Sequence, residues 1–420
     1  MKNTKLLTKR RHNLRVFFFF LLLITISGCK NFQKEPVTLT LFSYEPVYNT
    51  IIQKSVESFN TLHNKKLTVN IETVQYEPHI ILEQRLIEGK AWDLMMMPSY
   101  KTIQNFAGKG LLRDLTEYKA SEAIYSVFKP GVSFENRVYA LPYKANYYGI
   151  FYNRDIFKKY ELTPPSGLDN LRDITSTLKK NNIDAFSISG NQGWVMANVL
   201  YMFISQTAGD NFDHWVNGMN ANVSSFNTPV TQNAFEIFDF YISNGHKGFK
   251  TTNYSAHMDT FVNGQTAMII SSLSEIATYK RRNKDFNPGF IPFPVSDSDN
   301  NDLYADVDFG FALSNTISEK KIDMAVQFLE YLTTSDCMAE WEKDASILIP
   351  LKNNKSVAYQ DAIQYIENDK VVTWGHPKIP KIVLEESKRI LEDMVKSNLN
   401  TKSVIDKLDR SWQNYVKNKK

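Results

Sequence analysis

The sequence predicts an α/β fold, with open sheets covered by helices on both faces. The first observation is that strand-like and helix-like apolar patterns alternate along the N-terminal part of the chain. The second is length, because a chain of 420 residues can bury an ample core and is expected to divide into two lobes. Alternating strands and helices of this kind are typical of sheets with both faces covered.

The predicted elements follow the order β-α-β-α-β-α. Strands show alternating apolar residues or short apolar runs, whereas helices show apolar residues three or four positions apart. Strands are predicted at 38–42, 67–71 and 92–97, and helices at 52–62, up to about residue 89, and at 101–110. Further along, 155–265 is helical by pattern with polar loops, and apolar stripes at 322–332 and 382–416 predict further helices.

Polar and aromatic side chains follow two of the predicted strands. Tyr44 and Glu45 come directly after the first strand, and Tyr100 comes after the third. In open α/β sheets, ligands bind beyond the carboxyl ends of the strands. We therefore expect these three side chains to line a cleft.

The N-terminus carries a basic segment, an apolar run at 16–24 and the residues Ile26-Ser27-Gly28-Cys29. A basic region followed by a short apolar region is typical of an export signal, and this run is about half of the roughly 20 residues that span a membrane. The last four residues resemble a bacterial lipobox. The resemblance implies that 1–28 is removed, that Cys29 is lipidated and that 29–36 is a tether. An ordinary signal peptide with an accidental cysteine is the alternative.

The basic excess of the chain belongs to this export segment. The full sequence has 49 Lys and Arg residues against 45 Asp and Glu residues. Residues 1–28 contain six of the basic residues and no acidic one, so 43 against 45 remain and the net charge becomes about −2. We therefore expect no nucleic-acid partner, because the excess of positive charge is lost with the signal.

Cysteine usage predicts that no disulfide forms within the chain. Cys337 is the only cysteine besides Cys29, which lipid would block. A domain of this size can be stable without a disulfide. We expect Cys337 to be a core residue of a helix, since no basic residue lies three or four positions away to activate it.

Several well-defined chemical motifs are absent from the sequence. It contains no His-Glu-x-x-His, Cys-x-x-Cys, Gly-x-Ser-x-Gly or phosphate-binding loop. We therefore expect no metal, no cofactor and no catalysis. A glycoside hydrolase is the alternative that stays open, because its two carboxylates have no set spacing in a sequence.

A series of segments resembles one family. They are Trp-Asp-Leu-Met-Met-Met at 92–97, Gly-Leu-Leu-Arg-Asp-Leu-Thr at 110–116, Val-Tyr-Ala-Leu-Pro-Tyr at 138–143, Phe-Tyr-Asn-Arg-Asp-Ile-Phe at 151–157, Phe-Val-Asn-Gly-Gln-Thr-Ala-Met at 261–268, and Ala-Val-Gln-Phe-Leu-Glu-Tyr-Leu at 325–332, followed by Ile349-Pro350. In this order, behind a lipobox, they are similar to family 1 extracellular solute-binding proteins. Members of that family are receptor components of bacterial ABC importers and usually bind carbohydrates.

The resemblance implies a two-lobed, periplasmic-binding-protein-like fold of type II, in which crossover hinge strands join the lobes. It implies 37–145 plus about 270–315 for lobe 1, and 146–269 plus about 316–420 for lobe 2, with one crossover near 144–149. It also implies a monomeric receptor, held outside the cytoplasm by its lipid. Such a receptor would deliver a mono- or oligosaccharide to an ABC permease.

Residues that could bind a sugar can be nominated along the chain. Sugars stack their C–H faces on aromatic rings and hydrogen-bond through their hydroxyls. Trp194 and Trp374 lie in turn-rich segments and are expected to stack on the ligand, although Trp194 could instead pack on the core. Asn146 and Tyr147 lie on the implied crossover and Asp308 near the hinge, with a core position as the alternative for Tyr147.

Other solutes stay open at this point. A polyamine or another cation would need an acidic cleft with aromatic walls, for which Glu45, Asp93 and Asp308 are candidates. Tyr147 and Tyr148 could bind ferric iron if a histidine lay near them, although adjacent strand residues usually point to opposite faces. A receptor that serves a sensor instead of a permease would have the same sequence features.

Overall fold

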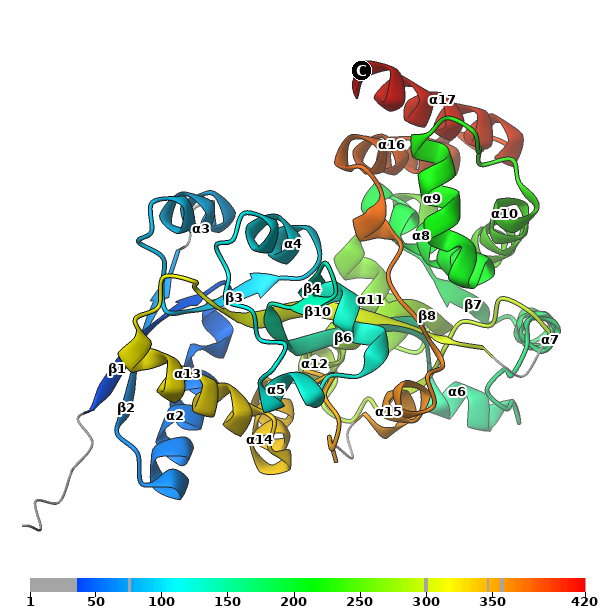
Figure 1. Cartoon of the computed structure of the whole chain (residues 1–420). Helices are drawn as coiled ribbons and strands as arrows, with labels where there is room; N and C mark the ends of the chain where they lie inside the picture. The colour runs from blue at the N-terminus through cyan, green and yellow to red at the C-terminus, as the bar shows by residue number, and fades with distance from the viewer. Residues whose placement is uncertain (1–35, 75–76, 298–300, 346, 356–358, 420) are drawn as a thin grey trace, which may run out of the picture.

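The computed structural model describes residues 36–419, apart from 75–76, 298–300, 346 and 356–358. The expected export signal 1–28, the expected lipid site Cys29 and nearly all of the tether 29–36 lie outside the described residues. In Figure 1 the helices of about residues 49–108 and 319–345 lie to the left, and the helices of about residues 193–243 and 381–419 lie to the upper right. The long strands β6 (Ala140–Tyr152) and β10 (Leu303–Leu313) run between these two groups.

The N-terminal part has the predicted alternation of strands and helices. Its elements are β1 (Val37–Ser43), α2 (Asn49–His63), β2 (Leu67–Thr73), α3 (Pro78–Ile87), β3 (Leu94–Pro98) and α4 (Lys101–Gly108). Strand β1 lies between β2 and β3 and pairs with both in parallel. The α/β prediction is therefore confirmed here, because helices connect the parallel strands.

Two long strands join the parts of the sheet. They are β6 (Ala140–Tyr152) and β10 (Leu303–Leu313), which pair in antiparallel register. The other strands are β4 (Ser133–Phe134), β5 (Arg137–Val138), β7 (Asp184–Ser187), β8 (Thr266–Ser272), β9 (Gly289–Ile291) and β11 (Val371–Val372). Within the described residues, nine strands form one sheet whose main order is β2-β1-β3-β10-β6-β8-β7. The sheet is therefore continuous between the two groups of helices.

Helices cover the sheet and form most of the C-terminal half. They are α5 (Lys119–Glu122), α6 (Arg154–Lys159), α7 (Leu168–Lys180), α8 (Gly193–Ala208), α9 (Phe212–Asn220), α10 (Pro229–Ser243), α11 (Tyr254–Val262), α12 (Ile276–Arg282), α13 (Glu319–Leu332), α14 (Ser335–Ala345), α15 (Gln360–Glu367), α16 (Lys381–Ser397) and α17 (Thr401–Lys419). Helix α8 is apolar on nearly every side and most of its residues are buried, as expected of a central helix.

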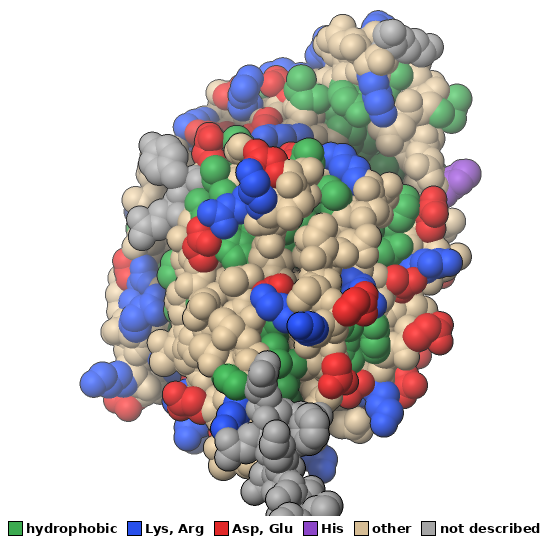
Figure 2. All heavy atoms as spheres, turned by 60° about the vertical axis from the view of Figure 1, so that its left-hand side comes forward, with side chains coloured by type: hydrophobic (Ala, Val, Ile, Leu, Met, Phe, Trp, Pro, Cys, Tyr) green, Lys and Arg blue, Asp and Glu red, His purple; other side chains and the backbone are tan. Residues whose placement is uncertain are grey.

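Two features of the described part concern a membrane and a nucleic acid as partners: the hydropathy of its helices and the charge of its surface. None of the helices in this part is both long and apolar enough to cross a membrane. On the face seen in Figure 2, Lys and Arg side chains are interspersed with Asp and Glu side chains. That face therefore carries no extended positive surface of the kind that binds a phosphate backbone.

The buried apolar side chains of the described residues form two clusters. The first contains β1, β2, β3 and much of β6 and β10, and the second contains α7, α8, α10, α16 and α17. Apolar residues of 317–366 belong to the first cluster, whereas those of 374–412 belong to the second. Helices α13, α14 and α15 thus pack with the N-terminal part, although the sequence placed everything from about 316 onward in lobe 2.

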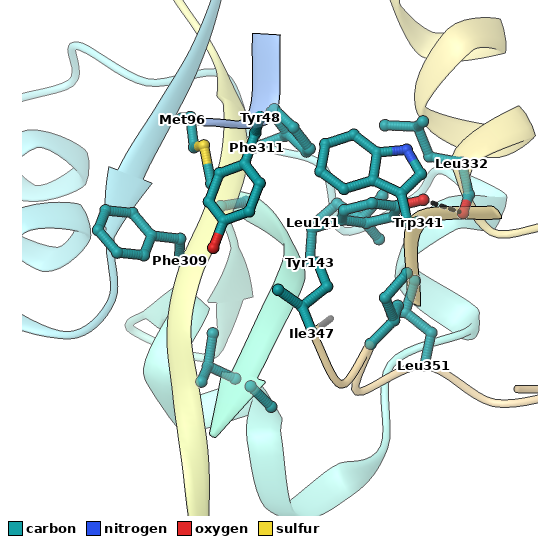
Figure 3. Packing of buried hydrophobic residues seen from close by; sticks show 14 of the residues in the cluster. Tyr48, Met96, Leu141, Tyr143, Phe309, Phe311, Leu332, Trp341, Ile347 and Leu351 are labelled. Carbon is teal, nitrogen blue, oxygen red and sulfur yellow. Dashed lines mark hydrogen bonds between the residues drawn. The ribbon is translucent and has the colours of Figure 1, made fainter. Parts of the chain in front are cut away.

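Helix α14 packs with the N-terminal part because its large side chains fill the core there (Figure 3). The indole of Trp341 is fully buried, lies 4.8 Å from the Tyr143 ring and donates a 2.8 Å hydrogen bond to the Ser55 hydroxyl. The Tyr143 hydroxyl donates to the carbonyl of Leu332 at 3.1 Å. Cys337 is buried beside them, as predicted, and burial raises the pKa of its thiol.

We expect Trp341→Ala to lower the free energy of unfolding by about 3–5 kcal/mol, because it removes a fully buried aromatic side chain and leaves a cavity. Thermal unfolding followed by circular dichroism measures the effect. The control is Val223→Ala, since Val223 is 81% exposed and its truncation should change stability by no more than about 0.5 kcal/mol. Equal unfolding midpoints for the two variants would contradict this packing.

Candidate functional site

One face of β6 carries a row of polar and aromatic side chains. Successive strand residues point to opposite faces, so Lys144, Asn146 and Tyr148 share one face. On β10, Tyr304 lies opposite Tyr148 and Asp306 lies opposite Asn146. Directly opposite residues of an antiparallel pair project to the same side. The two crossing strands together therefore present a polar surface between the two clusters.

The ammonium group of Lys144 lies among acidic and aromatic side chains. Its Nζ is 3.2 Å from a Glu45 oxygen and 3.0 Å from an Asp308 oxygen. It also lies 5.6 Å from the ring centroid of Tyr48 and 5.1 Å from that of Phe309. We call these five residues the ammonium cage. Burial alone would lower the pKa of Lys144, but Asp308, Tyr48 and Glu45 raise it above its ordinary value.

A bulge in β10 gives Asp308 its place in the cage. The pairing with β6 shifts between Val307 and Phe309, so Asp308 is an extra residue in the ladder. Such a bulge re-aims a side chain. The carboxylate of Asp308 therefore reaches Lys144 from the same strand that supplies the Phe309 ring.

Aromatic rings meet beside this surface. The Trp194 ring lies 4.8 Å from the Tyr254 ring, and Tyr254 donates a 2.8 Å hydrogen bond to Glu275. With Tyr148 and Ser272, these rings line a cavity of about 30 Å³, which has room for only about two waters. A ligand could enter only if the walls moved apart.

Trp194 is held at the start of α8 and reaches the surface. It is 37% exposed, and its indole N–H donates to Gln192 at 3.0 Å. A Cβ at Gly193 would lie 2.1 Å from the carbonyl oxygen of Lys388, so only glycine lets α8 begin this close to α16. Trp194 is thus not a core residue, which was the alternative considered from the sequence.

Trp374 lies next to Tyr148, with their ring centroids 5.9 Å apart. Its ring is stacked on His376 at 5.4 Å. The indole nitrogen is buried and has no hydrogen-bond partner among the described residues. A Cβ at Gly375 would lie 2.1 Å from the Ser205 hydroxyl. Close packing against α8 therefore fixes the segment that carries Trp374.

Tyr100 is buried, and its hydroxyl reaches the buried carboxylate of Asp306 on this face. Its hydroxyl donates to Asp306 at 2.5 Å, and burial together with Asp306 raises its pKa. Asp306 also accepts hydrogen bonds from the backbone N–H groups of Val307 and Trp374. Burial raises the pKa of Asp306 to about 7. Tyr100 thus joins the N-terminal part to β10 and to the segment of Trp374.

The structure separates Tyr147 from the other predicted site residues. Tyr147 is 3% exposed and packs on Phe151 and Phe290 on the opposite face of β6. There it lines a different cavity of about 320 Å³. The expectation that Tyr147 faces the cleft is wrong, because the two-residue period of the strand gives that face to Asn146 and Tyr148. The alternation could have identified Tyr148 and Lys144 from the sequence.

The remaining predicted residues lie together. Tyr44 packs on Phe309 with ring centroids 5.3 Å apart, next to the cage that contains Glu45. The Asn146 amide donates to Ser274 at 3.4 Å. Asn146, Lys144 and Ser274 line a cavity of about 100 Å³. Tyr254, Glu275 and Ser272 were missed, since no sequence pattern brings them to β6.

The ion pairs of three carboxylates and the directions of two tyrosines concern the alternatives of a polyamine and of ferric iron as ligands. Glu45 and Asp308 are paired with Lys144, and Asp93 is paired with Lys321 at 2.8 Å. Each carboxylate that suggested a polyamine therefore already has an ion-pair partner within the chain, although Glu45 and Asp308 share the single ammonium group of Lys144. Tyr147 and Tyr148 point to opposite faces, and the described residues contain no group of three or more His, Cys, Asp or Glu residues placed to bind a metal ion.

A model of the bacterial extracellular solute-binding protein family matches residues 45–338. The chain belongs to this family. Its members are solute-binding proteins of ABC transporters and act outside the cytoplasm, and the family is one of binding proteins, not of enzymes. The resemblance found in the sequence is thereby confirmed.

Individual members of the solute-binding family are similar to this chain over most of its length. The "Multiple sugar-binding protein" of Streptococcus mutans is 21% identical over 81% of this chain and 82% of its own. The apo form of RafE from Streptococcus pneumoniae superposes with a TM-score of 0.80 at 16% identity, covering 91% of this chain and 98% of RafE. RafE in complex with raffinose gives 0.70 at 17% identity, covering 90% and 99%. The two-lobed α/β fold is thus confirmed.

We expect this solute-binding protein to lose stability as the pH falls from about 6.5 to 4. Burial lowers the pKa of His257 from 6.5 to about 4, so only the unfolded chain takes up this proton in that range. The free energy of unfolding should fall by on the order of 2–3 kcal/mol through His257. Unfolding midpoints measured from pH 7.5 to 4 test this.

The pH experiment has matched variants. His257→Gln should lose less stability than the parent over the same range, because it has no proton to take up there. His79→Gln should behave as the parent, since His79 is exposed. If His257→Gln loses as much stability as the unaltered protein when the pH falls, groups other than His257 cause the loss.

Proposed function

We propose that this protein is a lipid-anchored receptor that binds a mono- or oligosaccharide between two lobes and delivers it to an ABC permease. The observation that carries the proposal is the aromatic group of Trp194, Tyr254 and Tyr148 beside the amide of Asn146 and neighbouring hydroxyls. The sugar-binding name of the Streptococcus mutans relative supports it, as does the raffinose bound to RafE.

This combination of side chains suits a sugar. A sugar ring presents an apolar C–H face and a rim of hydroxyls, so it needs a flat aromatic surface and fixed hydrogen-bonding groups. Trp194 offers an exposed indole face. The amide of Asn146 and the hydroxyls of Ser272 and Ser274 offer donors and acceptors without net charge. A neutral polyol is therefore the ligand class that this surface fits best.

The packing supports closure of two lobes around the ligand. We place β1–β3 and α13–α15 in one lobe, and α7–α10 with α16 and α17 in the other, because they belong to separate apolar clusters. Strands β6 and β10 and the chain between α15 and α16 cross from one to the other. Rotation about these crossings would open the small cavities at the site and then exclude water from a bound sugar.

We expect a sugar to raise the thermal unfolding midpoint of the domain beginning at residue 30. A ligand that binds the folded state at a hundredfold excess over Kd stabilises it by about 2.7 kcal/mol. The screen covers mono- and oligosaccharides including raffinose, with spermidine and Fe(III) in parallel. If every sugar leaves the midpoint unchanged while a cation raises it, the carbohydrate proposal is wrong. Hydrolysis of any sugar would contradict the absence of catalysis.

Trp194→Ala should weaken binding of the sugar found in that screen by roughly tenfold or more. Its stability should change by less than about 1 kcal/mol, because the side chain is partly exposed. Tyr415→Ala, on the distant helix α17, is the control and should keep its affinity. A large loss of stability with unchanged affinity would mean that Trp194 serves packing.

We expect Cys29→Ser to release the full-length protein from the membrane fraction of cells, because two or more acyl chains are needed for durable anchoring. Cys337→Ala is the control, since Cys337 is buried in the core. Mass spectrometry of the N-terminal peptide should detect the lipid. A Cys29→Ser protein that still sediments with membranes would contradict the anchor.

A further inference from the structure

The ammonium cage has the composition of a binding site for an alkylammonium ion. Two carboxylates, those of Glu45 and Asp308, lie 3.2 and 3.0 Å from the Lys144 nitrogen. The rings of Tyr48 and Phe309 lie within about 6 Å of it, the distance at which an aromatic face attracts a cation. Carboxylates and aromatic faces together are the groups by which proteins recognise ammonium ligands.

The cage is built on segments that the sheet holds in place. Glu45 and Tyr48 follow β1, Lys144 belongs to β6, and Asp308 and Phe309 sit at the bulge of β10. These strands meet in one sheet, in which β3 separates β1 from β10. The positions of the carboxylates therefore do not depend on Lys144 alone. If the Lys144 side chain were removed, the backbone would still hold two carboxylates and two rings around the space it left.

The cage also borders the proposed ligand surface. Lys144 and Tyr48 line the same cavity of about 100 Å³ as Asn146 and Ser274. The side chain of Lys144 is 13% exposed, whereas those of Glu45 and Asp308 are 31% and 30% exposed. Both carboxylates therefore keep an accessible edge next to Lys144, which lines this cavity, and a solute that reached Lys144 would lie close to them. Without Lys144 it would meet two adjacent negative charges with aromatic walls.

We propose that Lys144 determines specificity against cationic solutes, because its own ammonium group occupies a site that would otherwise bind an alkylammonium ligand. The exclusion of solutes rests on the proposed receptor function, whereas the existence of the ammonium site does not. With Lys144 present, the cage carries a net charge of −1, because one ammonium group lies between two carboxylates. Both carboxylates then already have an ion-pair partner. A neutral polyol has no such cost at this edge of the site, since it brings no charge to be desolvated.

The test is chemical rescue of Lys144→Ala. Alanine keeps Cβ, so the atoms removed correspond to n-propylammonium. Thermal unfolding of the variant is followed against n-propylammonium chloride, with sodium chloride added to hold the ionic strength constant. We expect the unfolding midpoint of Lys144→Ala to rise with amine concentration and to saturate, and that of the unaltered protein to stay constant. 1-Propanol, which has nearly the same shape and no charge, should give no saturable rise.

Two control variants make the rescue specific to the cage. Lys321→Ala removes a lysine that is paired, among the described residues, with the single carboxylate of Asp93, and it should respond less to the amine. Glu45→Gln in the Lys144→Ala background removes one carboxylate from the cage and should weaken the apparent amine affinity at least tenfold. Equal responses of Lys144→Ala and Lys321→Ala would overturn the proposal, because any exposed carboxylate would then suffice.

The ammonium site can still be tested if the Lys144→Ala variant does not fold. If the variant is unfolded on its own, the same titration becomes a refolding experiment followed by far-ultraviolet circular dichroism. Recovery with n-propylammonium and not with 1-propanol supports the site, and no recovery overturns it.

The amine titrations contain no sugar, so their result is separate from that of the ligand screen. Rescue by the amine without any sugar response would overturn the proposed function and keep the ammonium site. A response to sugar without rescue by the amine would support the proposed function and overturn the ammonium site.

Discussion

The antiparallel pairing of β6 with β10 is the interaction on which the rest of the structure depends. These two strands pass between the apolar clusters and connect the parallel strands of the N-terminal part to β8 and β7. Their ladder sets the register of every side chain that faces the site. A slip of one residue would turn Lys144, Asn146 and Tyr148 away and bring Tyr147 forward, because the side-chain period of a strand is two.

Burial of charge at this surface follows a consistent rule. Asp306 accepts hydrogen bonds from Tyr100 and from two backbone N–H groups, and Glu45 and Asp308 share Lys144. Taking a carboxylate out of water is costly unless such partners replace the water. The chain thus satisfies its own acidic groups before any solute arrives. Aromatic faces, amides and hydroxyls remain at this surface, which is the chemistry on which we base the proposal of a neutral polyol.

The likeness to the solved structures rests on packing more than on sequence identity. RafE shares 16% of aligned residues with this chain and still superposes over nine-tenths of it. Cores tolerate extensive apolar substitution when volume and pattern are kept, so the strand order and the helices persist. The ligand is decided by a few side chains on that frame. Lys144 and Trp194 are the side chains that we propose for this role, and the shared fold does not specify them.

The sequence by itself determined the fold class, the family, the early β-α-β order and the core position of Cys337, because apolar periodicity and a family's segments are local properties. It also nominated Trp194 and Glu45 as ligand contacts from turns and strand ends, and their part in binding stays a prediction. It placed Tyr147 on the wrong face of β6 and α13–α15 with the wrong cluster. Only the tertiary structure brought Tyr254 to Trp194 and Asp308 to Lys144. Contacts between segments more than fifty residues apart depend on register, a bulge and helix packing, which leave no local pattern in the chain.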